Sequence, residues 1–491
     1  MKLSELFINL DPKLIVSGKD NDPEIVDVCY DTRKIKPGVV FVCIKGAKAD
    51  SHDLAAEAVK AGAVALVVEH SVEANTVPVY QVEDTRIALA YMAAEYFGRP
   101  AEKLKKVGIT GTKGKTTTTF MLKAILEASG HKTGLMGSIE AMAGDKILHA
   151  PHNTTPESYE IQRLMAEMVT EGCEYLVMEM SSQGLKLNRA AGVEFEVGIF
   201  LDISRDHISP WEHATLEEYL YCKSLLFRQC KLGILNQDDA KLEEILKGHT
   251  CEVETYGFDP AADTHIEKVD TIQKPGYMGV HYTTTGKHPI DVTVGNPGNF
   301  TVYDSLAAFC AADHFGMDRS TYAKALEQVK ILGRVETIDI PADYSVIIDF
   351  AHDGIGVTNL VNGLKNYKPN HIIAVFGSDG NRTTIRRADI GEILGNSVDY
   401  TIITSNSPRF EPLEKINAEI EVGVKRTKGE YTIIEDRRTA IKEAMKRAVK
   451  GDMILLIGKG HWTTEEINGV EYPFDERQVV KELYEEICKG I

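Results

Sequence analysis

The chain has 491 residues, of which 43% are apolar and 26% are charged, and its formal net charge is −18 at pH 7. This length exceeds what a single hydrophobic core usually serves, so about three domains of ordinary globular composition are expected. The excess of acidic residues argues against nucleic acid as the main partner, because proteins that bind the phosphate backbone generally carry a basic face.

The N-terminal residues 1–14 alternate apolar and charged side chains and contain no uninterrupted apolar run of the kind found in signal peptides. No other stretch reaches the roughly 20 apolar residues that cross a membrane. The eight cysteines never form a C-x-x-C pair, so neither a zinc site nor a disulfide framework is predicted. We therefore expect a cytoplasmic protein without membrane insertion.

Short strand-like runs alternate with helical patterns along the chain. In chain order these runs are FVCIKG, AVALVVE, KVGITG, YLVMEM, VGIFLDI, SVIIDF, IIAVFG, YTIITS and MILLIG. The alternation predicts an α/β protein with mainly parallel sheets, whose ligands gather at the carboxyl ends of the strands. Glycine and proline near residues 98–100 and a second joint at residues 331–344 predict three domains, residues 1–98, 99–332 and 333–491.

A strand, a glycine-bearing turn and a helix are predicted over residues 107–129. Glycines let backbone N–H groups approach phosphate oxygens, and the N-terminus of a helix adds positive potential. Lys115 is expected to neutralise charge on the outer phosphates, and the Thr116 hydroxyl to hold Mg²⁺. The sequence therefore predicts a nucleotide site, although Ile109 occupies the first glycine position of the usual pattern. Its phosphate-binding residues are predicted to be Gly111, Thr112, Lys113, Gly114, Lys115, Thr116 and Thr117.

Three further blocks follow this turn. Glu179 follows the apolar run YLVM, a position where a carboxylate suits magnesium, which prefers hard oxygen ligands. The segment DISRDH, residues 202–207, follows the next run and ends in His207, and the amphipathic segment at residues 216–227 carries Lys223. Taken alone, such a histidine is more often structural and such a lysine is usually a solvated charge.

In this order the blocks resemble the Mur ligase family, which includes the folylpolyglutamate synthetases. The turn is similar to the family's ATP loop, and the later blocks to E-x-S-S-H-x-L, N-[LI]-S-x-D-H and Y-x-x-x-K-x-x-L-F. The resemblance implies that Lys115, Lys223 and His207 are catalytic and that Lys223 is carbamylated by carbon dioxide. Carbamylation turns a cation into an anionic oxygen ligand. The implied Mg²⁺ ligands are Thr116, Glu179, His207 and carbamylated Lys223.

The last third of the chain extends the resemblance. Residues 332–336 resemble the family's G-R-x-E and residues 349–352 its D-Y-A-H, while the segment that begins at Asn299 matches a helix-start element loosely. Alternatively, the arginine and glutamate of the first block form a surface salt bridge. The additional ATP-binding residues that the resemblance implies are Asn299, Arg334, Asp349 and His352.

Four later blocks resemble motifs typical of the MurE branch of the family. They lie at residues 376–382, 404–411, 458–462 and 474–477 and resemble F-G-x-G-G-D-R, T-S-D-N-P-R-x-E, G-K-G-H-E and F-D-D-R. The resemblance implies an amino-acid site in the C-terminal domain. Its residues would be Arg382, Ser407, Arg409, Gly458 and Trp462.

The first domain and a loop of the second also resemble this branch. Residues 31–33 and 50–52 are similar to its D-S-R and D-G-H elements, and residues 153–157 match N-T-T-P. The first two elements belong to the uridine-nucleotide domain of that branch, although a charged turn followed by a core strand is an alternative. The N-T-T-P element contacts the sugar-linked acceptor, and Arg189 is expected to pair with the anionic groups of the acceptor. The implied acceptor site consists of Thr32, Asn153, Thr154, Thr155, Ser182 and Arg189.

The resemblance implies a three-domain Mur ligase architecture, with a central P-loop ATPase domain and a Rossmann-like C-terminal domain. The implied reaction is the ATP-dependent addition of a diamino acid to UDP-N-acetylmuramoyl-L-alanyl-D-glutamate in peptidoglycan biosynthesis. It would proceed through an acyl phosphate and require Mg²⁺. We expect the enzyme to act as a monomer.

Departures from the family pattern leave alternatives open. They are Gln183, Asp202, Asp379, Asn381, Ser407 and Trp462. One alternative is a paralogue that uses another carboxylate acceptor, and another is a catalytically silent scaffold. For the amino acid, the Arg409 guanidinium favours meso-diaminopimelate, because it suits a distal carboxylate and repels an ammonium. Trp462 replaces the glutamate that would pair with the distal ammonium, so lysine and ornithine remain alternatives.

Overall fold

The computed structural model of this chain describes residues 1–46, 49–74, 76–149, 153–204, 208–209, 212–274 and 276–490. The chain divides into two compact units. The first contains Met1–His265 and Leu306–Asp318, and the second contains Ile266–Ser305 and Arg319–Ile491.

The first unit opens with a five-stranded sheet in the order β1-β5-β4-β3-β2. All neighbours in this sheet are parallel except β1 and β5. Asp84 caps the second helix, because its side chain accepts the N–H groups of Arg86 and Ile87 at 2.8 and 3.0 Å. The elements are β1 (Lys13–Val16), β2 (Asp27–Cys29), β3 (Val39–Val42), α1 (Ala55–Lys60), β4 (Ala65–Val68), β5 (Val79–Gln81) and α2 (Thr85–Tyr96).

A second sheet in this unit contains strands in the order β13-β12-β11-β6-β10-β7-β8-β9. Its strands are β6 (Lys105–Thr110), β7 (Thr133–Met136), β8 (Ala141–Ala143), β9 (Lys146–Leu148), β10 (Tyr175–Glu179), β11 (Phe195–Phe200), β12 (Cys230–Asn236) and β13 (Glu252–Gly257). The strands from β13 to β7 are parallel, and β8 and β9 add antiparallel hairpins at one edge.

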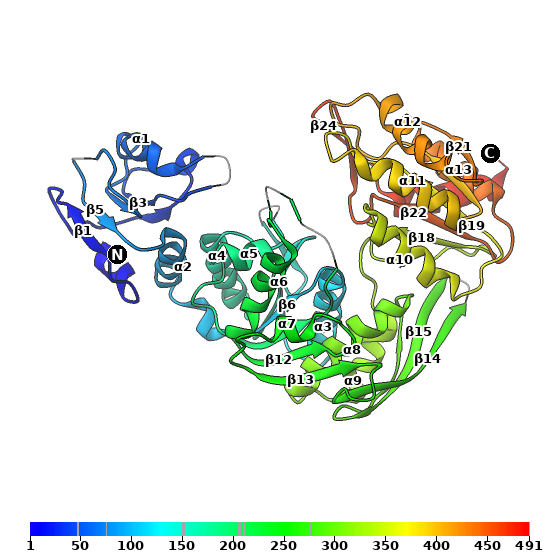
Figure 1. Ribbon diagram of the computed structural model, residues 1–491, viewed down its shortest axis with the longest axis horizontal. Coiled ribbons are helices and arrows are strands. Elements are labelled where there is room, and N and C mark those ends of the chain that lie inside the picture. Colours follow the sequence, from blue (N-terminus) through cyan, green and yellow to red (C-terminus); the bar gives the residue numbers. More distant parts are fainter. Residues whose placement is uncertain are drawn as a thin grey trace. The chain divides into compact units, whose positions relative to one another are not determined.

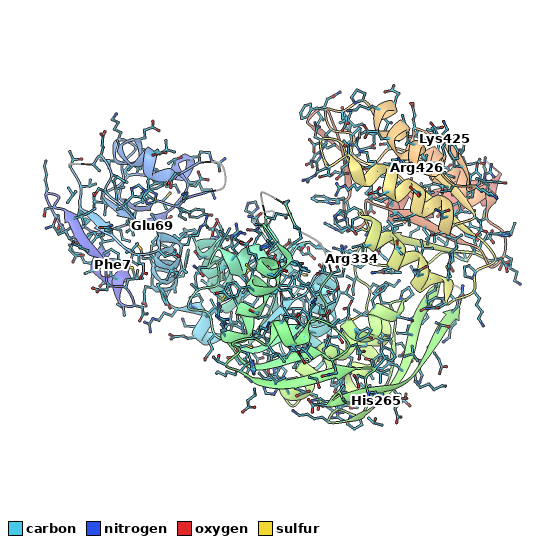
Figure 2. The ribbon with its side chains drawn as sticks, in the orientation of Figure 1. Phe7, Glu69, His265, Arg334, Lys425 and Arg426 are labelled. Atoms are coloured by element: carbon cyan, nitrogen blue, oxygen red, sulfur yellow. The ribbon has the colours of Figure 1, made fainter. Side chains whose placement is uncertain are left out.

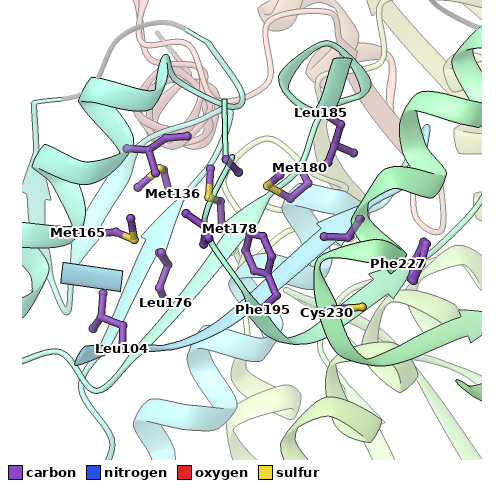
Figure 3. Close-up of a cluster of buried hydrophobic side chains, with 14 of the residues drawn as sticks. Leu104, Met136, Met165, Leu176, Met178, Met180, Leu185, Phe195, Phe227 and Cys230 are labelled. Atoms are coloured by element: carbon purple, nitrogen blue, oxygen red, sulfur yellow. The ribbon is translucent and has the colours of Figure 1, made fainter. Parts of the chain in front are cut away.

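Helices cover this second sheet (Figure 1). They are α3 (Lys115–Ala128), α4 (Ser158–Thr170), α5 (Ser182–Lys186), α6 (Leu216–Ser224) and α7 (Leu242–Ile245). Helix α3 packs against β6, β7 and β10. Figure 3 shows part of the core of this unit, where Met178 and Phe195 lie among other apolar side chains. Burial on both faces explains why β10 reads as the continuous apolar run YLVM before Glu179.

The second unit contains a six-stranded sheet in the order β17-β18-β22-β19-β20-β21, in which only β17 is antiparallel. Alternate residues of β18 serve two cores: Ile347 packs with residues of α10 to α12, and Val346 and Ile348 pack with α13 and α14. This period of two places helices on both faces of the sheet, which is the doubly wound arrangement. The strands are β17 (Glu336–Thr337), β18 (Ser345–Asp349), β19 (Ile372–Phe376), β20 (Tyr400–Ile403), β21 (Glu430–Ile433) and β22 (Met453–Ile457).

The other elements of the second unit are helices and hairpin strands. The helices are α8 (Asn299–His314), which continues into the first unit, α9 (Arg319–Gln328), α10 (Gly354–Lys365), α11 (Ile385–Ser397), α12 (Leu413–Val424), α13 (Arg437–Arg447) and α14 (Glu476–Lys489). The hairpin strands are β15 (Tyr277–Gly286) with β16 (Asp291–Val294), and β23 (Thr464–Ile467) with β24 (Val470–Pro473). Strand β14 (Thr264–Lys274) begins in the first unit.

The α/β prediction with mainly parallel sheets is confirmed, and two local expectations need revision. The nine strand-like runs of the sequence correspond to β3, β4, β6, β10, β11, β18, β19, β20 and β22, so the remaining strands, among them β7, β12 to β16 and β21, were not predicted. The predicted helix over residues 216–227 ends as an α-helix at Ser224 and continues as a 3₁₀ turn at Leu225–Arg228. Among the described residues, no helix combines the length and apolar content needed to cross a membrane.

Candidate active site

Three loops meet at the carboxyl edge of the second sheet in the first unit. The register pairs Glu179 of β10 with Ile109 of β6, and Phe200 of β11 with Thr110 of β6. Glu179, the turn after β6 and the segment after β11 therefore emerge at the same edge, where parallel sheets bind ligands. The sequence placed these groups at strand ends, and the strand order brings them together.

The turn between β6 and α3 is built to approach an anion. Gly114 has φ of +81°, a left-handed conformation that favours glycine, and stands directly before the N-terminus of α3. The Lys115 Nζ donates to the carbonyl oxygens of Gly111 and Thr112 at 2.8 and 3.1 Å. The ammonium is thus held over the turn whose N–H groups and helix end attract phosphate.

Asp202 ties this turn to the neighbouring strand. Its Oδ1 accepts the backbone N–H of Lys113 at 2.8 Å, and its carbonyl oxygen accepts the N–H of Thr112 at 3.0 Å. Burial raises the pKa of this carboxyl, and the Lys113 N–H and the charges of Lys115 and Lys223 oppose the shift. Asp202 therefore braces the turn between β6 and α3.

Glu179 forms a buried acceptor beside the loop. Its side chain accepts hydrogen bonds from the Thr116 hydroxyl at 2.9 Å and from the Ser138 N–H and hydroxyl at 3.0 and 2.9 Å. The residue is 1% exposed, and within the described ranges no cationic side chain forms an ion pair with it. A buried carboxylate with only neutral donors is costly unless a cation joins it, so this donor set fits a magnesium ion.

Lys223 lies at the same place. It is 1% exposed, its Nζ donates to the Gly111 carbonyl oxygen at 2.7 Å, and it lies 4.7 Å from the ring centre of Tyr219. Lys115 donates to the same carbonyl oxygen, so the two amines approach one acceptor. The remaining predicted catalytic and metal residue, His207, lies outside the described residues.

Some of the predicted acceptor-binding residues lie around Glu179. The Thr155 hydroxyl donates to the Glu179 carbonyl oxygen at 2.9 Å, and the Thr154 hydroxyl lies 2.9 Å from that of Ser138. Arg189 donates to the Thr155 carbonyl oxygen at 2.9 Å and forms an ion pair with Glu157 at 3.3 Å. The other predicted acceptor-binding residues have different surroundings. The Ser182 hydroxyl lies 2.9 Å from His213 Nε2, Asn153 is exposed, and Thr32 begins a 3₁₀ turn after β2.

Sequence reasoning missed three side chains at this edge. Ser138 binds both oxygens of Glu179, the Tyr219 hydroxyl lies 3.1 Å from that of Thr112, and buried His213 contacts Ser182. For Ser138 a signal was present, since it follows the apolar run that forms β7. The Gly137 beside it has no room for a side chain, because an added Cβ would meet the Glu179 carboxylate.

In the second unit, Asp349 ends β18 and is buried. Its carboxylate accepts the N–H groups of Val335 and Ala351 at 2.8 and 2.7 Å. Burial raises the pKa of this carboxyl, while the positive charge of Arg334 and the two N–H donors oppose the shift. Asp349 therefore fastens the residue before β17, Val335, to the carboxyl end of β18.

The other predicted nucleotide residues of this unit lie around that strand end and on α8. Arg334, labelled in Figure 2, lies with its guanidinium 4.9 Å from the ring centre of Phe350. The His352 ring lies 3.0 Å from the Phe350 carbonyl oxygen, and Asn299 begins α8. The alternative of a salt bridge between Arg334 and Glu336 is wrong.

Glu336 instead forms an ion pair with Arg477 at 2.6 Å. The same carboxylate also accepts the N–H of Gly333 at 2.7 Å. Because Arg477 already satisfies this carboxylate, Arg334 is left to lie over the aromatic ring of Phe350.

The predicted amino-acid residues follow β19, β20 and β22, which are neighbours in the sheet. Arg409 has φ of +54°. Gly458 has φ of +104°, and a Cβ added to this glycine would lie 3.0 Å from the Gly377 carbonyl oxygen. The Ser407 hydroxyl accepts the N–H of Glu466 at 3.3 Å, and Trp462 is 47% exposed. Arg382 is exposed on the loop after β19.

Two neighbours of Trp462 have shifted pKa values. Burial, together with the charge of Arg437, lowers the pKa of Lys459 to about 8. Burial and the charges of Arg334 and Arg477 lower the pKa of His461 to about 4, so its imidazole is neutral at pH 7. His461 therefore adds no positive charge to this segment at neutral pH.

Sequence comparison covers nearly the whole chain. Residues 24–97 match the Mur ligase family catalytic domain, residues 109–312 the Mur ligase middle domain, and residues 333–460 the glutamate ligase domain of Mur ligases. A protein of Caldanaerobacter subterraneus subsp. tengcongensis is 40% identical over 96% of this chain and 97% of its own length. The chain belongs to the Mur ligase family.

That relative is named UDP-N-acetylmuramoyl-L-alanyl-D-glutamate--2,6-diaminopimelate ligase. A Clostridium botulinum protein of the same name is 37% identical over 96% of this chain and 97% of its own length. A solved structure of an enzyme with that name has a TM-score of 0.69 and 25% identity, and covers 94% of this chain and 95% of the other. The predicted membership of the Mur ligase family, in its MurE branch, and the ligase class are confirmed.

A Mur ligase of another branch has the same fold. The MurF ligase of Thermotoga maritima, solved in complex with ADP, has a TM-score of 0.62 and 20% identity over 94% of this chain and 98% of that one. At this identity the likeness concerns the fold alone.

Proposed function

We propose that this enzyme joins 2,6-diaminopimelate to UDP-N-acetylmuramoyl-L-alanyl-D-glutamate at the expense of ATP, a step of peptidoglycan synthesis. The observation that carries the proposal is the convergence of Lys115, Glu179 and Lys223 at one sheet edge. It occurs in a chain that diaminopimelate ligases match over 96% of its length. We place the reaction in the cytoplasm and expect a monomer.

The chemistry begins with a repulsion between two anions. The terminal carboxylate of the acceptor attacks the γ-phosphorus of ATP, and ADP leaves. The amine of the incoming amino acid then attacks the acyl carbon, loses a proton, and phosphate leaves. Lys115 supplies positive charge where the phosphates approach the carboxylate, and positioning accounts for most of the rate.

The assignment of binding roles follows the sequence prediction. Residues 111–117 and Asn299, Arg334, Asp349 and His352 bind ATP, and Thr32, Asn153, Thr154, Thr155, Ser182 and Arg189 bind the acceptor. The amino acid is bound by Arg382, Ser407, Arg409, Gly458 and Trp462. These roles belong to domains at residues 1–98, 99–332 and 333–491.

A magnesium ion would be held by Thr116, Glu179, His207 and carbamylated Lys223. When bound, it would neutralise phosphate charge and polarise the phosphoryl group. The neutral donors around buried Glu179 support this assignment. The two amines at the Gly111 carbonyl oxygen support carbamylation, since converting Lys223 to an anion replaces a repulsion from Lys115 by an attraction.

Replacing Lys223 by alanine should leave the enzyme nearly inactive, because the anionic carbamate ligand is lost. Acetate or propionate should restore part of the activity by supplying carboxylate oxygens in the vacated space. The measurement is the rate of ligation at increasing carboxylate concentration, with wild type as the reference. Rescue by chloride as effective as rescue by acetate, or full activity without any addition, would contradict the carbamate role.

The function itself is tested by a ligation assay. Purified enzyme is mixed with UDP-N-acetylmuramoyl-L-alanyl-D-glutamate, ATP, Mg²⁺ and a panel containing meso-diaminopimelate, lysine and ornithine, and products are identified by mass. We expect the diaminopimelate product and stoichiometric ADP and phosphate. Product with none of the diamino acids, alongside activity on a folate or polyglutamate acceptor, would replace the proposal by the paralogue alternative.

A further inference from the structure

Arg409 is held by two other segments of the C-terminal sheet region. Its N–H donates to the Glu466 carbonyl oxygen at 2.9 Å, and its own carbonyl oxygen accepts the N–H of Asn468 at 2.7 Å, both on the β23–β24 hairpin. On the other side, the Gly380 N–H donates to the Ser407 carbonyl oxygen at 2.9 Å. The loop after β19, the loop after β20 and the hairpin are therefore fastened together around Arg409.

The side chains of these three segments form a cluster of one cation and two anions. Arg409 Nε lies 3.3 Å from a carboxylate oxygen of Glu466, and Arg409 Nη2 lies 3.9 Å from one of Asp379. The side chains of the three residues are 26%, 32% and 32% exposed. Solvent reaches part of each side chain, so a dissolved ligand can approach their exposed atoms.

The contacts within the cluster are loose. Arg409 Nε is buried, and in the part of the chain that the structure describes it has no hydrogen-bond partner. Neither ion pair involves Nη1. Partly exposed pairs at these distances stabilise a fold little, so a ligand carboxylate can displace them at small cost. A bidentate carboxylate would satisfy the guanidinium better than either present partner.

Asp379 is positioned independently of Arg409. Its Oδ1 accepts a hydrogen bond from the Asn406 amide at 2.9 Å, which leaves Oδ2 as the atom directed to the guanidinium. Gly380 packs directly on the next segment, since an added Cβ would meet the Pro408 carbonyl oxygen. The carboxylate therefore stays beside Arg409 when the guanidinium takes another partner.

We propose that Asp379 and Glu466 bind the distal ammonium of the incoming diamino acid while Arg409 binds its distal carboxylate. The inference rests on the proposed function and names two specificity residues within it. One guanidinium between two carboxylates complements a group that carries one carboxylate and one ammonium. Trp462, at the nearby segment after β22, has no carboxylate to offer, whereas Asp379 and Glu466 do.

The test compares meso-diaminopimelate with 2-aminopimelate, which has the distal carboxylate and lacks the distal ammonium. Wild type should prefer meso-diaminopimelate in kcat/KM by at least roughly 10-fold, as expected for hydrogen bonds between charged groups. In Asp379→Asn and Glu466→Gln the KM for meso-diaminopimelate should rise several-fold with kcat little changed. The kcat/KM for 2-aminopimelate should stay near the wild-type value, which also shows that each variant is folded.

Glu471→Gln is the matched control, because Glu471 pairs with Glu466 across the hairpin and is exposed. It removes the same charge from the same hairpin and should leave the preference unchanged. A preference that is also unchanged in Asp379→Asn, Glu466→Gln and their double variant would overturn the inference. A wild type that ligates no diamino acid at all would instead overturn the proposed function.

Discussion

Replacing Lys115 by alanine is expected to lower the turnover number by about 10³-fold, which is near the upper end of the loss seen when one charge-stabilising donor is removed. The Lys115 Nζ lies over the turn after β6, where it contacts the Gly111 and Thr112 carbonyl oxygens. Without it, the phosphates and the acceptor carboxylate meet with less charge neutralised. Single-turnover formation of ADP from ATP and the UDP-linked acceptor measures the loss.

The variant should remain folded, because the two hydrogen bonds of Lys115 within the described residues are worth about 1 kcal/mol each and little core packing is lost. Lys123→Ala is a matched control, because it removes a lysine from the same helix two turns away from Lys115. Lys123 forms an ion pair with Glu127 at 2.6 Å. It should keep near wild-type turnover, and thermal unfolding checks both proteins. Normal turnover in Lys115→Ala would remove the ATP-site assignment.

Replacing Arg409 by alanine is expected to lower kcat/KM for meso-diaminopimelate by about 10²-fold, because a charged bidentate partner of the distal carboxylate is lost. The same change should leave kcat/KM for lysine unchanged or raise it. Lysine has no distal carboxylate, and its ammonium would no longer face a guanidinium between Asp379 and Glu466. The ratio of the two kcat/KM values is the readout.

Arg426→Ala provides the comparison, since Arg426, labelled in Figure 2, is an exposed arginine of the same unit that pairs with Glu392 at 3.2 Å. It should leave both values unchanged. A wild type that prefers lysine would reject Arg409 as the selector of diaminopimelate. An Arg409→Ala variant with the wild-type ratio would do the same.

Much of the fold and part of the candidate site could be predicted from local sequence patterns. The run YLVM of β10 and the run VGIF of β11 are continuously apolar because both faces of a parallel sheet are covered. The glycine turn before α3 and the position of Glu179 directly after an apolar run could also be predicted from the sequence. Each depends on neighbours only a few residues away.

Partnerships between distant segments required the tertiary structure. Strand order decides that Ser138, after β7, donates to Glu179, at the end of β10. Glu466 faces Arg409 because the β23–β24 hairpin forms backbone hydrogen bonds with the loop after β20. Periodicity specifies which face of a strand is buried, but it does not specify which strand lies beside it.

For this protein, the sequence by itself determined the α/β class, the glycine turn before α3 and the resemblance that led to the Mur ligase family. Only the tertiary structure decided that Glu336 pairs with Arg477 and that Lys115 and Lys223 approach one carbonyl oxygen. The physical reason is that a side chain's chemistry is local, whereas its electrostatic environment depends on what folding brings within a few ångströms.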